Sequence, residues 1–99
     1  MGTKLAPRDM ELYQRVDEVL HYVWDPIGVS TMARGRDEYY MYLPDVFALV
    51  TRDVDARTIA EYLNEVTTQR MGLAKDPSHT LQVANLLLAW KRNVHEHDA

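Results

Sequence analysis

The sequence predicts an all-α fold, a compact bundle of about four helices in which neighbours run mostly antiparallel. Apolar residues recur at spacings of three and four along four separate stretches, which is the repeat of one face of an α-helix. No stretch alternates apolar and polar residues with the period of two that strands show. The connections between the four stretches are short, and no repeat or linker interrupts them, so we expect a single domain over residues 1–99 with frayed ends at 1–8 and 95–99.

The first helix is expected from about Asp9, which can serve as its N-cap, to Trp24. Its apolar stripe consists of Leu12, Tyr13, Val16, Val19, Leu20, Val23 and Trp24. Pro26 should end this helix, because proline disfavours helical backbone at the preceding Asp25 and has no amide hydrogen to donate.

The second helix is expected to open at Asp37 and to run to about Thr51. The residues that share its inward face are Tyr39, Leu43, Val46 and Val50. Pro44 inside such a helix would clash with the carbonyl of Tyr40 and cost about 3 kcal/mol. Two alternatives follow: one helix kinked at Pro44, which we favour, or a short turn over 37–42 and then a helix with Pro44 at its first position.

The third and fourth helices have clear end signals. Asp55 is expected to cap a helix over 56–71, and Gly72 is expected to end it in a left-handed conformation. Asp76 followed by Pro77 is a typical start for the fourth helix. Its broad apolar face suggests a central helix and consists of Leu81, Ala84, Leu87, Leu88 and Lys91, flanked by Val83, Leu86, Trp90 and Val94.

Three segments carry a family resemblance. They are Val23-Trp24-Asp25-Pro26-Ile27-Gly28-Val29, Asp37-Glu38-Tyr39 and Leu43-Pro44-Asp45-Val46. Over about residues 12–73 the chain resembles an uncharacterised family of small bacterial all-helical proteins, whose third helix closes with a pair such as Met71-Gly72. The resemblance implies a fold and no activity. Where that family has an acidic or small polar residue after Asp-Glu-Tyr, this chain has Tyr40 and Met41.

That departure predicts an exposed patch. On a helix that points Tyr39 inward, Met41 lies about 150° from the core direction and Tyr40 lies at its edge. We call the candidate partner-binding residues the 32–42 patch; they are Met32, Arg34, Arg36, Tyr40 and Met41. Scattered exposed apolar residues are common, but Tyr, Met and Arg are also enriched where proteins bind each other. The same composition is typical of engineered binding surfaces, so a natural and a surface-altered origin both stay open.

Composition argues against several other classes of function. The formal net charge is −4, whereas nucleic-acid-binding domains carry a basic surplus. The chain has no cysteine, which excludes disulfides and thiolate chemistry and fits a reducing compartment such as the cytoplasm. The first nine residues are polar and lack the apolar core of a signal peptide, and no apolar run is long enough for a membrane helix.

The remaining candidate sites have simpler structural explanations. Trp24, Asp25, Pro26 and Gly28 are expected to form a structural turn in which Asp25 accepts hydrogen bonds from loop amides. The alternative, a carboxylate pair of Asp25 with Asp37 or Glu38, lacks the partner that acid–base catalysis would need. The segment 95–98 contains histidines and acids but is expected to be a solvated tail, so we expect no metal and no cofactor.

Together these patterns predict a non-catalytic protein-binding module, monomeric when unbound, that presents the 32–42 patch to a protein partner. The alternative is a small bacterial accessory protein, of the immunity or antitoxin kind, whose acidic surface masks a basic target.

Overall fold

The computed structural model describes residues 6–29 and 38–97, and within them the chain is helical with no β-strand. The helices are α1 (Pro7–Glu18) continued by η1 (Val19–Trp24), α2 (Leu43–Thr51), α3 (Ala56–Glu65) continued by η3 (Val66–Arg70), and α4 (Pro77–His97). The segments η1 and η3 are π-helical turns that prolong α1 and α3. The predicted all-α bundle of four helices is confirmed.

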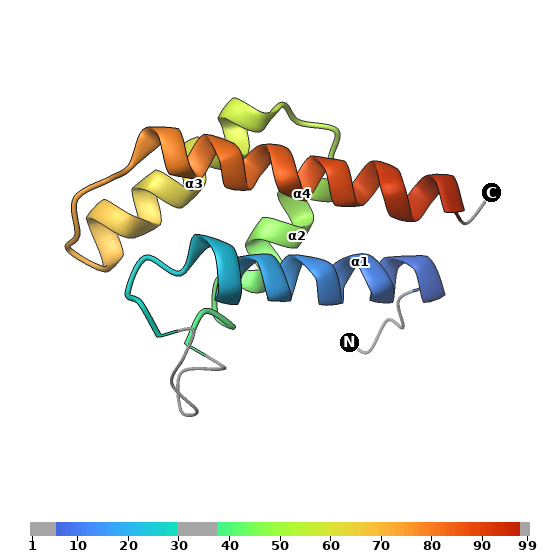
Figure 1. The fold of residues 1–99 in the computed structure, drawn as a ribbon, viewed down its shortest axis with the longest axis horizontal. Coiled ribbons are helices and arrows are strands. Elements are labelled where there is room, and N and C mark those ends of the chain that lie inside the picture. The colour runs from blue at the N-terminus through green and yellow to red at the C-terminus, as the bar shows by residue number, and fades with distance from the viewer. Residues whose placement is uncertain (1–5, 30–37, 98–99) are drawn as a thin grey trace.

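The long helix α4 lies at the centre of the bundle (Figure 1). It packs against α3 along one side and against α1 and η1 along the other, and α2 fills the space between α1, α3 and α4. The start of α1 and the end of α4 lie at one end of the molecule, while η1, η3 and the start of α4 lie at the other (Figure 1). In residues 6–29 and 38–97, no helix has the length and apolar character needed to cross a bilayer.

The first helix begins earlier than the sequence predicted. Ala6, and not Asp9, is the N-cap residue, and Pro7 is in the first turn. Proline is well placed there, because its fixed φ suits a helix and its missing amide hydrogen would have had no partner. Asp9 instead lies inside the first turn, where its carboxylate interacts favourably with the positive end of the helix dipole.

The end of this helix agrees with the prediction. The amide of Asp25 donates to the carbonyl of Leu20 over 3.0 Å, a bond that spans five residues and closes the wide π-helical turn. Asp25 then adopts a left-handed conformation with φ of 34° and ψ of 58°. Pro26 follows directly, so the chain leaves the helix at the predicted point.

The favoured prediction of one kinked helix over 37–51 is wrong. Residues 38–42 form tight turns, in which the amide of Tyr42 donates to the carbonyl of Tyr39 (3.0 Å) and that of Leu43 to the carbonyl of Tyr40 (3.2 Å). α2 starts only at Leu43, with Pro44 in its first turn. The less favoured alternative is the observed one, because this position spares proline both the lost hydrogen bond and the clash. The proposed cap at Asp37 lies outside the described residues.

The end signals of the third and fourth helices are confirmed. The Oδ1 atom of Asp55 accepts from the amide of Thr58 at 2.9 Å, and that of Asp76 accepts from the amide of His79 at 3.2 Å. Gly72 has a φ of 67°, and the next amide, of Leu73, reaches back to the carbonyl of Thr67 at 2.9 Å. This bond reaches one residue further back than in the Schellman motif, as expected after a π-helical turn, but glycine is favoured for the same reason, its left-handed conformation.

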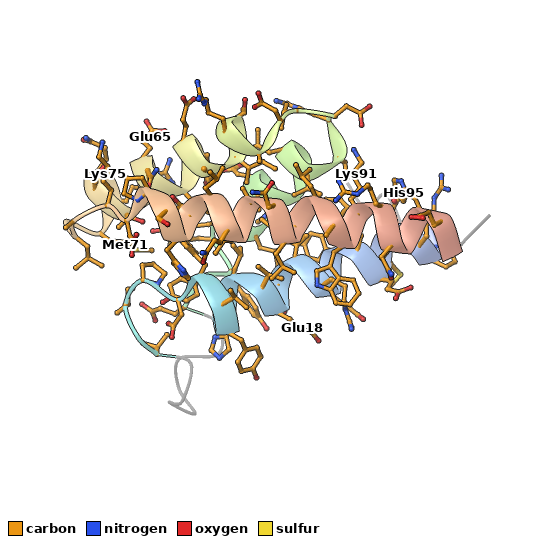
Figure 2. The ribbon with its side chains drawn as sticks, turned by 45° about the horizontal axis from the view of Figure 1, so that its top comes forward. Glu18, Glu65, Met71, Lys75, Lys91 and His95 are labelled. Carbon is orange, nitrogen blue, oxygen red and sulfur yellow. The ribbon has the colours of Figure 1, made fainter. Side chains whose placement is uncertain are left out.

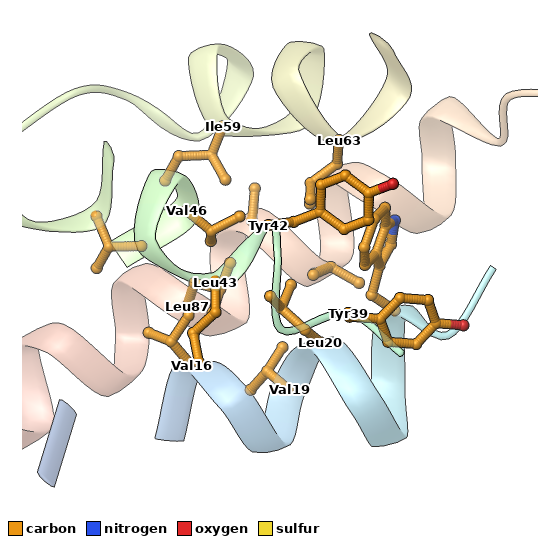
Figure 3. Close-up of a cluster of buried hydrophobic side chains, with 14 of the residues drawn as sticks. Val16, Val19, Leu20, Tyr39, Tyr42, Leu43, Val46, Ile59, Leu63 and Leu87 are labelled. Atoms are coloured by element: carbon orange, nitrogen blue, oxygen red, sulfur yellow. The ribbon is translucent and has the colours of Figure 1, made fainter. Parts of the chain in front are cut away.

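The buried face of α4 differs in part from the predicted one. Leu81 was expected on the central line but is 44% exposed, whereas Val83 and Leu87 are fully buried. α4 also remains helical to His97, where a frayed tail was expected from residue 95. The core around Leu87 joins α1, η1, α2, α3 and the 38–42 turn, as Figure 3 shows through Val16, Leu20, Tyr42, Val46 and Leu63.

The contrast along α4 gives a stability test. Leu87→Ala removes a fully buried side chain and should lower the free energy of unfolding by about 2–5 kcal/mol. Leu81→Ala makes the same chemical change at an exposed position and should cost no more than about 0.5 kcal/mol. Urea unfolding followed by circular dichroism measures both. Equal losses would contradict this orientation of α4.

Candidate functional site

The structure exposes the two described residues of the predicted patch. Met41 is 71% exposed and Tyr40 is 47% exposed, whereas their neighbours Tyr39 and Tyr42 are buried. The tight turn explains this alternation, since residues three apart lie on the same side of a turn with about three residues per revolution. The exposure was therefore predicted correctly, although from a helix that does not exist here. Met32, Arg34 and Arg36 lie outside the described residues.

Met41 borders a hollow of about 400 Å³, which we call the Met41 hollow. Its lining combines apolar and aromatic residues with one acid and one base and consists of Pro26, Ile27, Glu38, Met41, Tyr42, Arg70, Met71 and Leu73. The Arg70 guanidinium lies over the ring of Tyr42, 5.8 Å from its centre. The hollow thus joins the 38–42 turn to the ends of two helices that are far apart in the sequence.

A second hollow of about 620 Å³ adjoins the first, and Pro26 and Leu73 line both. We call it the His79 hollow. Its lining comes from the end of η1, from η3, from the 73–76 connection and from the start of α4: Tyr22, Val23, Trp24, Asp25, Pro26, Thr67, Leu73, Ala74, Asp76, His79 and Thr80. Figure 2 shows Met71 at this end of the bundle, far from His95 at the other end of α4.

Exposed apolar side chains are concentrated around these hollows. Eight large hydrophobic residues in the described part of the chain are exposed, and five of them line one hollow or both: Tyr22, Val23, Ile27, Met41 and Leu73. Only Met41 of these belonged to the predicted patch. Polar residues such as Asp76 and Arg70 lie among them in the linings. Grouped apolar side chains, unlike single scattered ones, are typical of a binding site.

A hydrogen-bond network holds the wall between the hollows in place. The Oδ1 atom of Asp25 accepts from the amide of Val29 at 2.8 Å and from the hydroxyl of Tyr39 at 2.7 Å. The same hydroxyl accepts from the amide of Ile27 at 3.1 Å. The prediction that Asp25 binds loop amides is confirmed. The Oδ1 atom of this carboxylate thus has a structural role. The alternative of a carboxylate pair with Glu38 is not tested by these bonds, and Asp37 lies outside the described residues.

Three buried aromatic rings pack beside this network. The Trp24 ring packs against Tyr39, with centres 5.3 Å apart, and edge-on against Tyr42 at 6.3 Å. All three side chains are buried, and Figure 3 shows Tyr39 and Tyr42 at one edge of the core. Gly28 follows with a φ of 79°, a conformation that costs side-chain-bearing residues about 1 kcal/mol or more. Trp24, Asp25, Pro26 and Gly28 thus form the structural turn that was predicted.

His79 and His95 lie at opposite ends of α4. His79, which was expected on the surface, is half-buried, and its Nε2 atom lies 2.9 Å from the carbonyl oxygen of Val23 and 3.2 Å from that of Trp24. Since both neighbours are acceptors, Nε2 carries the proton and donates. His95 lies in α4 beside Lys91, bordering a different hollow. Among the residues that the structure describes, no three metal-ligating side chains come together.

Sequence reasoning missed most of the apolar rim. Val23 was placed on the buried stripe of the first helix, but it is 41% exposed because the π-helical turn rotates it away from the core. Ile27 and Leu73 have no helical period to give their direction. One sequence signal could have indicated their exposure. Ile27 follows the helix end marked by Asp25-Pro26, and Leu73 follows the one marked by Gly72. Just after a helix end, an apolar side chain has no neighbour on the next helical turn to pack against.

Comparison with known proteins identifies no relative of this chain. The chain matches no protein-family model, no curated protein and no solved structure at a significant level. The resemblance to small bacterial helical proteins therefore stays a prediction.

The Asp25–Tyr39 bond can be tested by removing one hydroxyl. Tyr39→Phe keeps the ring but deprives Asp25 of a donor and the amide of Ile27 of an acceptor, and it should lower the free energy of unfolding by about 1–2 kcal/mol. Tyr62→Phe is the matched control, because the Tyr62 hydroxyl bonds Asp45 at an exposed site and its loss should cost no more than about 0.5 kcal/mol. Equal effects in chemical denaturation would refute a special role for Tyr39.

The same bond should depend on pH. Burial, followed by the hydrogen bond to Asp25, raises the pKa of Tyr39 well above its ordinary value of 10.0. The unfolded chain therefore releases this proton at a lower pH than the folded one, so the stabilisation is complete below about pH 10 and declines as the pH rises further. The stability difference between the wild type and Tyr39→Phe should be constant up to about pH 9.5 and shrink as the pH rises above about 10. A constant difference would contradict the bond.

Proposed function

We propose that this protein is a non-catalytic protein-binding module whose contact surface is centred on Met41 and Tyr40. The observation that carries the proposal is the placement of Met41, which is 71% exposed on a turn between two buried tyrosines and borders the Met41 hollow. Tyr and Met side chains supply large buried areas when a partner covers them, and such anchors dominate binding energy.

Rigidity supports this role. Tyr39 and Tyr42 are buried on either side of Tyr40 and Met41, and Tyr39 is tied to Asp25. The turn that presents the anchors is thus held at both ends by the core. A surface that is ordered before binding loses less conformational entropy when the partner docks.

The polar groups near the surface favour binding over catalysis. Asp25 is occupied by Tyr39 and Val29, and Nε2 of His79 donates to backbone carbonyls. The Oδ1 atom of Asp25 and the Nε2 atom of His79 are thus used in hydrogen bonds that hold backbone segments together, which favours a structural role for both side chains. The net charge of −4 argues for a protein partner over a nucleic acid.

Three further parts of the proposal come from the sequence. Arg34 and Arg36 would extend the surface by pairing with acidic groups of the partner, and Met32 would add apolar area. The absence of cysteine supports a cytoplasmic location. We propose a monomer when unbound, and its origin as a natural or surface-altered protein makes no difference to the tests below.

The first test is to find the partner and then to remove the anchors. A photoreactive residue at position 41 should crosslink the partner, and one at Met10, which is 52% exposed on α1, serves as the control position. Replacing Tyr40 and Met41 together by alanine should weaken binding to the crosslinked partner by about 1–3 kcal/mol and leave the melting temperature nearly unchanged. Unchanged affinity, or a loss of the fold, would refute the proposal.

The salt dependence of binding distinguishes this proposal from the alternative, in which an acidic surface of the protein covers a basic target. Binding through apolar anchors should weaken only a few-fold when salt is raised from about 0.05 M to about 0.5 M, because burial of apolar area is not screened. Association steered by the acidic surplus should instead slow more than about tenfold. Steep dependence of the association rate, measured by stopped flow, would favour the immunity or antitoxin alternative.

A further inference from the structure

The two hollows differ in their charges, and this difference indicates what each can accept. The Met41 hollow contains one acid and one base, Glu38 and Arg70. The His79 hollow is lined by two acids, Asp25 and Asp76, and by no lysine or arginine among the described residues. The nearest lysine in sequence, Lys75, borders a separate hollow beside Glu61 and Glu65.

The walls of the His79 hollow suit a long side chain with a cationic tip. Tyr22, Val23 and Leu73 provide exposed apolar surface at its rim. Lysine and arginine side chains place their methylene groups along such surfaces while the charged end reaches a polar partner. Asp76 is exposed, and its Oδ1 accepts one hydrogen bond from the amide of His79, so its carboxylate can accept a further donor.

The position of the hollows supports a binding role for both. The two π-helical segments, η1 and η3, end beside them: Tyr22, Val23 and Trp24 from η1 and Thr67 from η3 line the His79 hollow, and Arg70 from η3 lines the Met41 hollow. π-Helical turns weaken regular hydrogen bonding and are common at functional sites. Two such turns border the same concave surface.

We propose that the partner inserts a lysine or arginine side chain into the His79 hollow, against Asp76, beside an apolar side chain that fills the Met41 hollow. This inference rests on the proposed protein-binding function and adds the chemistry of the partner to it. Pro26 and Leu73 line both hollows, so the two side chains come from neighbouring positions of one partner segment. The apolar anchor supplies affinity, and the cation selects among apolar segments.

The experiment uses random linear peptides displayed on phage and selected on the immobilised full chain. Peptides whose binding is lost on Met41→Ala are kept, sequenced and synthesised. We expect them to share a lysine or arginine close to a large apolar residue. Replacing that basic residue by glutamine should weaken binding about five- to twentyfold, the range of a partly desolvated charged hydrogen bond.

A matched pair of variants locates the cation. Asp76→Asn removes the charge but keeps a good helix cap, so α4 should still form. Asp55→Asn makes the same change at the cap of α3, the opposite end of that helix from η3 and the hollows. Asp76→Asn should weaken binding of the basic peptide about five- to twentyfold and should have little effect on binding of the peptide in which glutamine replaces the basic residue. Asp55→Asn should change the affinity for either peptide less than about twofold.

The outcomes separate this inference from the function on which it rests. Peptides that depend on Met41 but carry no basic residue, or that bind Asp76→Asn as well as the wild type, would overturn the cationic partner and leave the binding surface standing. A selection that yields no peptide dependent on Met41 would contradict the inference and the proposed function together.

Discussion

The hydrogen bond from the Tyr39 hydroxyl to Asp25 connects the two parts of the chain that build the candidate surface. Asp25 ends the first helix in a left-handed conformation, and Tyr39 belongs to the turn that precedes α2. One 2.7 Å bond joins the turn to the helix end, and the ring of Trp24, tilted by 53° against that of Tyr39, adds apolar contact. The bond thus couples the loop that carries Ile27 to the turn that carries Met41, and these two residues border the Met41 hollow.

The candidate surface is a consequence of how the helices end at this side of the bundle. η1 ends at Asp25 and η3 ends before Gly72, and both ends turn back through a residue with positive φ. His79 then joins the start of α4 to the carbonyls that η1 leaves without helical partners. These connections bond backbone groups at the helix ends, but they leave the side chains of Val23, Ile27 and Leu73 at the surface, where they border two hollows with mixed polar and apolar linings.

The 38–42 turn shows how a correct prediction can rest on a wrong element. The exposure of Met41 was expected from a helix, whereas the structure has a tight turn before α2. Both geometries place Tyr39 inward and Met41 outward, because residues two apart diverge in direction in either. They differ in how the buried tyrosines are spaced: the turn brings Tyr42 beside Tyr39 and lets both reach Trp24. Pro44 decided between the two geometries, since it is stable at the start of a helix and unfavourable within one.

The sequence by itself determined the helical class, most helix ends and the buried character of residues with a clear helical period, since caps, prolines and apolar spacing act over a few residues. The caps at Asp55 and Asp76, the stop at Asp25-Pro26 and the exposure of Met41 belong to this group. Only the tertiary structure decided which side of α4 faces the core, that Val23 turns outward, and that Ile27, Met41 and Leu73 meet around one hollow. These features depend on contacts between segments far apart in the chain, and no local pattern encodes the distance between two helix ends.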